Sequence, residues 1–148
     1  MPAHCGHVYV MHWNVAAKQK LFVPAYSMTD GRVRGFLINT DVPLFFQTKP
    51  ELMAHVLPIQ HSLNSGFLQH DSWLCCNEVV GGFTVTQLEN ATGSYRGPID
   101  STLQVEVLRV VQTSRLIPER DKVQILANWP PTPPAVPASA PSIAPEPI

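Results

Sequence analysis

Short apolar segments separated by turn residues make up most of the chain, and this pattern predicts β-strands. The expected strands cover residues 7–12, 21–25, 33–40, 56–59, 67–80 and 83–88. Proline cannot donate to a ladder, so Pro24 and Pro58 indicate edge strands or bulges. Thr29-Asp30-Gly31 is a strong turn signal, and Gly81-Gly82 predicts a hairpin that pairs the last two strands.

The stretch from His61 to Val80 combines the best strand candidate with a polar cluster. His70, Asp71 and Ser72 interrupt its apolar residues. Polar side chains within a strand need a partner or face a groove, so these three are the first functional candidates. In the alternative, Asp71 and Ser72 bond to the backbone of a neighbouring loop and hold the fold together.

The segments between the strands predict loops and short helical turns. Residues 13–20 form a polar loop that carries Lys18 and Lys20, and residues 90–98 form another loop. Lys49-Pro50-Glu51 predicts a helical turn with proline at its first position.

The last third of the chain predicts helices. Ser101 and Gln104 match a capping box at the start of a helix, whose apolar face comprises Leu103, Val107, Val110 and Val111. The alternation of Leu103, Val105 and Val107 leaves a strand as the alternative. Pro118 begins a second short helix through about Ala127, with Val123, Leu126 and Ala127 as its apolar stripe.

These elements predict a mainly β domain: a small, strongly bent antiparallel sheet that closes on itself, followed by one or two C-terminal helices. Strands and helices do not alternate, which excludes a doubly wound fold. The domain covers residues 1–127. Residues 128–148 hold eight of the fifteen prolines and predict a disordered, extended tail. The tail contains Pro-x-x-Pro, which gives the alternative of a ligand for an aromatic-lined groove.

Composition narrows the classes of function. The net charge is −1 and charged residues make up 14%, so any site for RNA or another polyanion must be a local patch. No apolar run is long enough to span a membrane, and the N-terminus does not resemble a signal peptide. Cys75 and Cys76 should point to opposite faces of a strand, which disfavours a disulfide between them. A cytoplasmic location follows most simply.

The basic and histidine side chains are the candidates for binding and catalysis. Lys18, Lys20, Arg32 and Arg34 could form a patch for phosphate, although such residues are more often only solvated. An acid–base pair could come from two histidines with an aspartate that orients them, namely His61, His70 and Asp71.

Two further groups have alternatives of their own. His4, Cys5 and His7 are metal ligands by type, but their spacing matches no zinc pattern, so we expect neither a metal nor another cofactor. Trp13 and Tyr26 could stack on bases or, more commonly, pack in the core or at a dimer interface.

The order of segments over about Gly6 to Ile117 resembles the PemK/MazF-like family of plasmid-maintenance toxins, which are small SH3-like barrels. The resemblance is carried by four segments: Gly6-His7-Val8-Tyr9-Val10 as the opening strand, Leu37-Ile38-Asn39-Thr40 as the third strand, Phe67 to Leu74 as a later strand, and Gly97-Pro98-Ile99 before the Ser101 helix. The His61 and Asp71-Ser72-Trp73 spacing is closer to a divergent phage and plasmid branch.

The resemblance implies a metal-independent endoribonuclease that acts on single-stranded RNA, often a homodimer with an antitoxin bound over its groove. For such a ribonuclease the resemblance implies Lys18, Lys20 and Thr40 as catalytic residues. The candidates from the residues themselves add Asp71 to catalysis and Arg32, Arg34, His61 and His70 to RNA binding. Thr40 matches the family's hydroxyl position. The family's arginine falls in Lys18-Gln19-Lys20, where lysine loses bidentate phosphate recognition, and the proline that follows it is absent.

The sequence therefore supports two functions. One is a toxin-like ribonuclease encoded by a mobile genetic element. The other is a non-catalytic SH3-like binding module of phage or plasmid origin that binds a protein partner. The low charge and the missing arginine favour the second.

Overall fold

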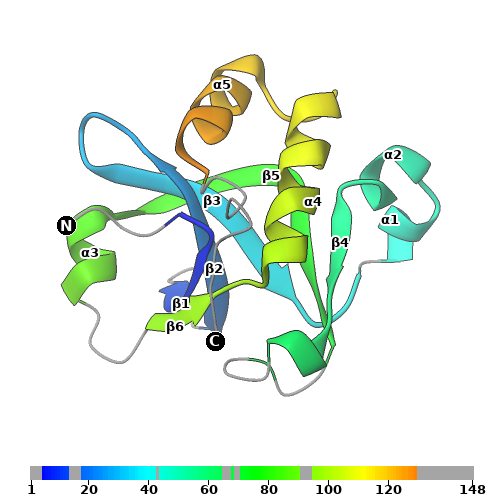
Figure 1. The fold of residues 1–148 in the computed structure, drawn as a ribbon, viewed down its shortest axis with the longest axis horizontal. Coiled ribbons are helices and arrows are strands. Elements are labelled where there is room, and N and C mark those ends of the chain that lie inside the picture. The colour runs from blue at the N-terminus through cyan, green and yellow to red at the C-terminus, as the bar shows by residue number, and fades with distance from the viewer. Residues whose placement is uncertain are drawn as a thin grey trace, which may run out of the picture.

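The computed structural model describes residues 5–13, 18–42, 44–64, 68, 71–90 and 95–129. Within these residues the chain forms one antiparallel sheet of six strands in the order β4-β5-β3-β2-β1-β6 (Figure 1). The strands are β1 (His7–Trp13), β2 (Lys18–Ser27), β3 (Arg32–Asn39), β4 (Val56–Ile59), β5 (Ser72–Thr84) and β6 (Tyr95–Pro98). The sheet curls into an open half barrel.

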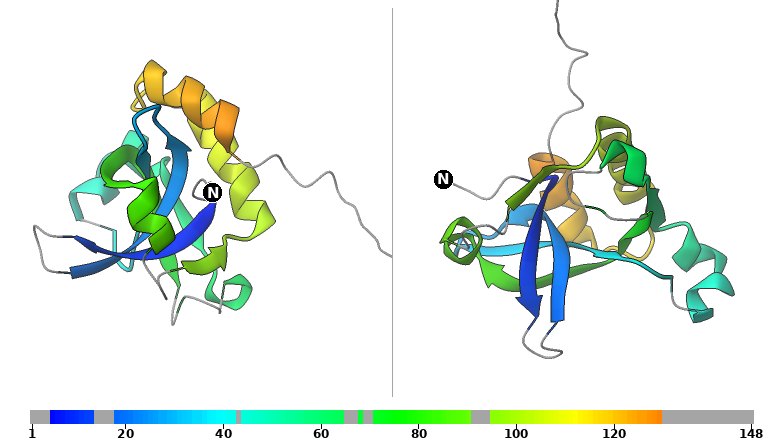
Figure 2. Two further views of the ribbon diagram at one scale, coloured as in Figure 1. Left: turned by 90° about the vertical axis from the view of Figure 1, so that its left-hand side faces the viewer. Right: turned by 90° about the horizontal axis from the view of Figure 1, so that it is seen from below.

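Two longer helices follow the sheet, and shorter ones lie within the connections. The helices are α1 (Leu44–Gln47), α2 (Pro50–Met53), α3 (Val85–Asn90), α4 (Ser101–Thr113) and α5 (Glu119–Asn128), and a 3-10 turn covers His61–Leu63. Figure 2 shows α1 and α2 together at the side of the molecule opposite α3. The predicted fold class is confirmed: a mainly β domain with a strongly bent antiparallel sheet and C-terminal helices. The sheet is open where closure was expected, because its edge strands β4 and β6 do not pair with each other among the described residues.

The curl of the sheet has a local cause in β2 and β3. The pairing register shifts between Pro24 and Tyr26, so the predicted proline bulge lies in a central strand. Opposite Pro24 stands Gly35, where an added Cβ would lie 2.1 Å from the carbonyl oxygen of Val23. Only glycine permits the two backbones to approach this closely.

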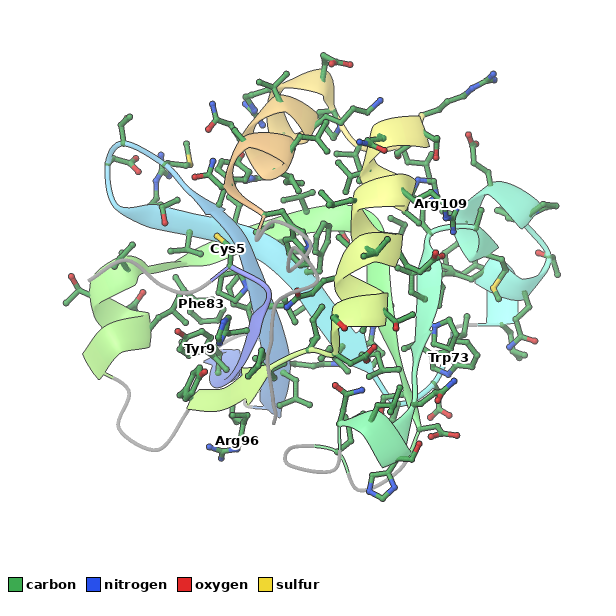
Figure 3. The ribbon with its side chains drawn as sticks, in the orientation of Figure 1. Cys5, Tyr9, Trp73, Phe83, Arg96 and Arg109 are labelled. Carbon is green, nitrogen blue, oxygen red and sulfur yellow. The ribbon has the colours of Figure 1, made fainter. Side chains whose placement is uncertain are left out.

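The two faces of the sheet bury separate apolar cores. The larger core lies between the sheet and the helices α4 and α5 and includes Phe36, Val107 and Ile125. The smaller core lies beneath α3 and includes Tyr9, Phe22, Phe83 and Leu88 (Figure 3). The ring of Phe22 packs edge-on against that of Phe83, with centroids 5.3 Å apart.

The predicted hairpin at Gly81-Gly82 is wrong. β5 continues through both glycines to Thr84, where it still pairs with Arg32 of β3. Helix α3 then begins at Val85. Thr84 and Gln87 form a capping box: the Gln87 amide donates to the Thr84 hydroxyl at 3.1 Å, and the Thr84 amide donates to the Gln87 side chain at 2.8 Å. The capping box fixes the start of α3, while pairing with β3 keeps β5 extended across the glycine pair.

Three other predicted boundaries also differ from the structure. Lys18 and Lys20 lie at the start of β2 instead of in a loop, and the predicted loop 90–98 contains β6, which pairs with β1. The cap of α4 is Asp100, whose carboxylate accepts the Leu103 amide at 3.0 Å. α4 is a helix, so the strand alternative for this segment is wrong.

The apolar stripe predicted for α5 is also wrong. Val123 is 55% exposed and Leu126 is 39% exposed, whereas Asp121 and Ile125 face the core. The core extends to Trp129, whose indole nitrogen donates to the Gln104 carbonyl oxygen at 3.0 Å. Ordered packing therefore continues two residues beyond the predicted domain boundary at 127, while residues 130–148 lie outside the described residues.

Among the helices that the structure describes, none combines the length and the apolar character needed to cross a membrane.

Candidate binding site

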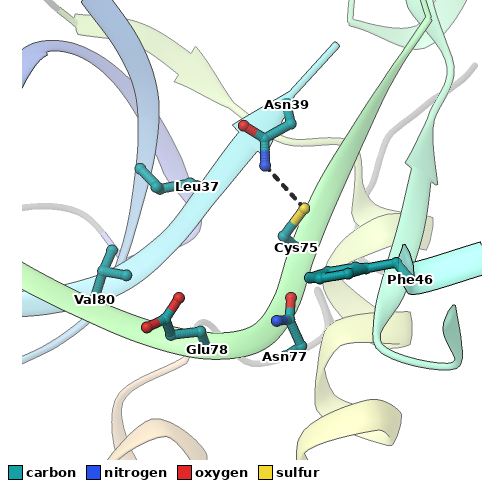
Figure 4. A pocket seen from close by; sticks show the side chains of 7 residues that line it. All are labelled: Leu37, Asn39, Phe46, Cys75, Asn77, Glu78 and Val80. Carbon is teal, nitrogen blue, oxygen red and sulfur yellow. Dashed lines mark hydrogen bonds between the residues drawn. The ribbon is translucent and has the colours of Figure 1, made fainter. Parts of the chain in front are cut away.

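Neighbouring residues of β3 and β5 divide between the two faces of the sheet. Ile38, Leu74 and Cys76 belong to the core beneath α4. The residues next to them, Leu37 and Cys75, line a pocket of about 90 Å³ on the opposite face (Figure 4). The lining residues are Leu37, Asn39, Phe46, Cys75, Asn77, Glu78 and Val80.

The pocket has apolar sides and polar ends. Leu37 and Val80 lie on one side, and the ring of Phe46 from α1 lies on the other (Figure 4). Asn39 and Glu78 stand at opposite ends. The pocket therefore presents an apolar channel between two polar groups.

At one end, Asn39 is held by two partners. Its side-chain Nδ2 donates to the Cys75 Sγ at 3.1 Å, and its Oδ1 accepts from the Lys20 Nζ at 2.8 Å. Burial raises the pKa of the Cys75 thiol, while the Asn39 hydrogen bond and the Lys20 charge act in the opposite direction. A thiol with a raised pKa stays protonated near neutral pH, so Cys75 is not an activated nucleophile.

At the other end, Asn77 and Glu78 follow each other on β5. Neither side chain has a hydrogen bond or an ion pair with the residues that the structure describes. Asn77 is half-buried and Glu78 is exposed. The carboxylate can only accept hydrogen bonds, and the amide can both donate and accept, so this end can bind a ligand group.

The predicted catalytic residues gather at one end of the sheet. Lys18 and Lys20 start β2, Thr40 directly follows β3, and Asp71 directly precedes β5. The pairing of Asn39 with Trp73 brings the ends of β3 and β5 together. Lys20, Thr40 and Asp71 do not line the pocket, which begins at Asn39, one position before Thr40. The side chain of Lys18 lies outside what the structure describes.

Asp71 also has a role in the backbone structure. Its Oδ1 accepts the His61 amide at 2.8 Å, which links the 3-10 turn to the start of β5. This is the structural alternative that the sequence left open for Asp71. His70, the other predicted histidine, lies outside the described residues.

Arg32 and Arg34 lie at the far end of β3, away from the lysines. Arg32 forms an exposed ion pair with Asp30 at 2.7 Å. Arg34 donates to the Oδ1 of the buried Asp121 at 3.2 Å and to the Val79 carbonyl oxygen at 2.9 Å. The guanidinium of Arg34 is therefore engaged within the fold, and the two arginines do not extend a patch that includes Lys20.

Tyr26 completes the contact with Asp121. It is buried, and its hydroxyl donates to the Asp121 Oδ1, so it packs in the core and does not form a stacking platform. Burial, together with the hydrogen bond to the Asp121 carboxylate, raises the pKa of Tyr26 to about 12. The side chain of Trp13 and the whole of His4 lie outside what the structure describes.

A second buried polar cluster joins Ser114 to His55, and both side chains have hydrogen-bond partners within the protein. The Ser114 hydroxyl lies 2.6 Å from the His55 Nε2, and the His55 Nδ1 lies 2.8 Å from the Glu51 carbonyl oxygen. The same hydroxyl accepts the Leu116 and Ile117 amides at 3.0 Å each. Both side chains are buried, so this pair fastens α4 to the segment after α2 and does not form a hydrolytic dyad.

Metal ligands do not cluster in the part of the chain that the structure describes: no group of three or more His, Cys, Asp or Glu residues could hold an ion there. Comparison with models of protein families and with curated proteins finds no match for this chain. The relation to the PemK/MazF-like toxins thus remains a resemblance in the order of segments.

The pocket residues were missed from the sequence because no motif marks them. Cys75 and Asn77 lie within the strand predicted for residues 67–80, and the sequence predicts no element that contains Phe46. One signal was present: Asn77 and Glu78 are polar residues in the middle of a long strand. The same reasoning that selected Asp71 and Ser72 applies to this second polar step.

Proposed function

We propose that this chain is a non-catalytic binding module, whose protein partner docks over the pocket and helix α1. The observation that carries the proposal is the unpartnered state, within the described residues, of the Asn77 and Glu78 side chains at the pocket. By contrast, Arg34 is hydrogen-bonded to Asp121, and Ser114 is hydrogen-bonded to His55, both inside the protein.

The surroundings of the pocket favour a protein over a small molecule. The pocket volume of about 90 Å³ is below the roughly 300 Å³ at which drug-sized ligands are usually held. Next to it, Leu44 is 81% exposed and Phe45 is 57% exposed. The ring of Phe45 contacts that of Phe46 edge-on, with centroids 4.7 Å apart, so the exposed apolar surface continues into the pocket. Apolar surface of this kind, beside polar groups, is typical of protein-binding sites.

A photo-crosslinking experiment tests this proposal. A benzophenone amino acid replaces Phe45 in the full chain expressed in its host, and the matched control carries it at Val123, which is similarly exposed on α5. We expect discrete protein adducts at position 45, their loss when Glu78→Lys is added, and no adducts at position 123. Absence of a Glu78-dependent adduct at position 45 overturns the proposal.

A ribonuclease is the second candidate, because Lys20, Thr40 and Asp71 lie at the same end of the sheet. Cleavage would need a base for the 2′-hydroxyl, an acid for the leaving oxygen and a cation for the phosphorane. Lys20 is the cation that the described residues supply there, with Lys18 beside it on β2. If the purified protein cleaves mixed-sequence single-stranded RNA without added metal, and Lys20→Ala abolishes the cleavage, the enzyme replaces the module as the conclusion.

A further inference from the structure

The shape and polarity of the pocket restrict which part of a partner can enter it. The sides are formed by Leu37, Val80 and Phe46, which suit an aliphatic chain. At the end whose side chains have no partner among the described residues, Glu78 offers a carboxylate and Asn77 offers its side-chain carbonyl oxygen. A ligand that fills this space needs an apolar stem and a positively charged hydrogen-bond donor at its tip.

Two other charged groups lie near the pocket. Arg34 donates to the Val79 carbonyl oxygen, next to Glu78, and is paired with Asp121. Lys20 lies at the opposite end. The Lys20 ammonium is bonded to the Asn39 Oδ1, and Figure 4 shows Asn39 at the end away from Glu78. Repulsion from Lys20 directs a cation toward Glu78 and not toward Asn39. Of the described residues that line the pocket, Glu78 is the one with a charged side chain.

We propose that the pocket binds a lysine side chain of the partner. The four-carbon stem lies between Leu37, Val80 and Phe46. The ammonium donates to the Glu78 carboxylate and to the side-chain Oδ1 of Asn77. A compact ammonium fits the small volume better than the broader guanidinium of arginine. This inference rests on the proposed function, because it assigns the chemistry of the docking partner.

The probe is Nα-acetyl-L-lysine methylamide, added to the ¹⁵N-labelled full chain and followed by amide chemical shifts. We expect saturable shifts centred on Asn77 and Glu78. Two changes should each weaken binding by about three- to five-fold, which is the loss of one charged contact at an exposed carboxylate. They are the Glu78→Gln substitution and replacement of the probe by its uncharged norleucine analogue. Raised salt should weaken binding in the same direction.

The control variant is Glu119→Gln, which removes an exposed carboxylate from α5 and should leave the titration unchanged. The inference is overturned if the norleucine analogue binds as tightly as the lysine probe, if the arginine analogue binds more tightly, or if the shifts lie outside the pocket. If the lysine probe does not bind but the crosslinked adduct at position 45 still forms, the lysine inference is wrong and the proposed binding module stands. Binding of the probe without any adduct supports the pocket chemistry and removes the protein partner.

Discussion

Beneath α4 and α5 the buried polar side chains have partners inside the protein, and Asp121 binds through its Oδ1 while its Oδ2 has no hydrogen bond among the described residues. On the pocket face, neither the Asn77 nor the Glu78 side chain has a partner among the described residues. The first face carries the larger core, closed by two helices. The second carries a small core beneath α3 and is hollowed beside it. Polar groups that a fold leaves unpaired at a pocket are the ones available to a ligand, so the comparison separates residues that stabilise this protein from residues that can bind.

The largest effect should come from the centre of the helix-covered face. Asp121→Ala leaves the Arg34 guanidinium without its carboxylate and the buried Tyr26 hydroxyl without its acceptor. We expect a loss of about 3 kcal/mol in the free energy of unfolding, as when one partner of a buried ion pair is removed. Urea denaturation followed by circular dichroism measures the loss.

The matched control for this change is Glu119→Ala, an exposed carboxylate on the same helix, for which we expect a change within about 0.5 kcal/mol. If the two alanine variants unfold at the same urea concentration, the contacts of Asp121 do not stabilise the helix-covered face.

A smaller effect should appear only at alkaline pH. The pKa of Tyr26 is about 12 in the folded protein and about 10 when a tyrosine is exposed. A raised pKa means that the folded state holds the proton more tightly, so the stabilisation is complete below about pH 10 and is lost as the pH rises toward 12.

The variant Tyr26→Phe isolates the pH-dependent stabilisation that comes from the Tyr26 hydroxyl. Its unfolding free energy should decline less steeply than that of the native protein between about pH 9 and 12, because phenylalanine does not titrate. Burial also raises the pKa of Cys5, to about 11, but Cys5 is present in both proteins and its contribution cancels. Parallel declines would show that Tyr26 is not the group that titrates.

The smallest effect on stability should come from the pocket face. Asn77→Ala and Glu78→Gln remove groups that make no hydrogen bond within the described residues. We expect each to change the free energy of unfolding by less than about 0.5 kcal/mol. Comparing their free energies of unfolding with that of Asp121→Ala tests whether the helix-covered face contributes more to stability than the pocket face. A loss above about 1 kcal/mol would mean that Asn77 or Glu78 stabilises the fold.

Much of the fold follows from local sequence signals. The alternating apolar positions predict five of the strands, and Pro118 predicts the start of α5. The errors arose where local signals compete. Gly81-Gly82 favours a turn, but the pairing of Phe83 with Val33 extends β5 across it. Val123 and Leu126 fit an apolar stripe, but the burial of Asp121 against Tyr26 and Arg34 rotates α5 so that both valine and leucine face outward.

The candidate site depends on contacts that periodicity does not record. Phe46 and Glu78 are thirty-two positions apart and line the same pocket because α1 lies against this face of the sheet. The arginines expected to bind RNA also depend on partners that the sequence does not reveal. Asp121 forms an ion pair with Arg34, and Asp30 forms one with Arg32. A basic residue in a sequence shows its charge but not the carboxylate that will neutralise it.

The position of Trp129 has a practical consequence for work with this domain. Its indole packs edge-on against Phe36 and closes the end of α5 directly before the proline-rich stretch. A shorter version of the protein should therefore retain this tryptophan, because a cut made at the visible change in composition would remove part of the hydrophobic interior. The same ring offers an intrinsic fluorophore that reports whether the last helix is seated.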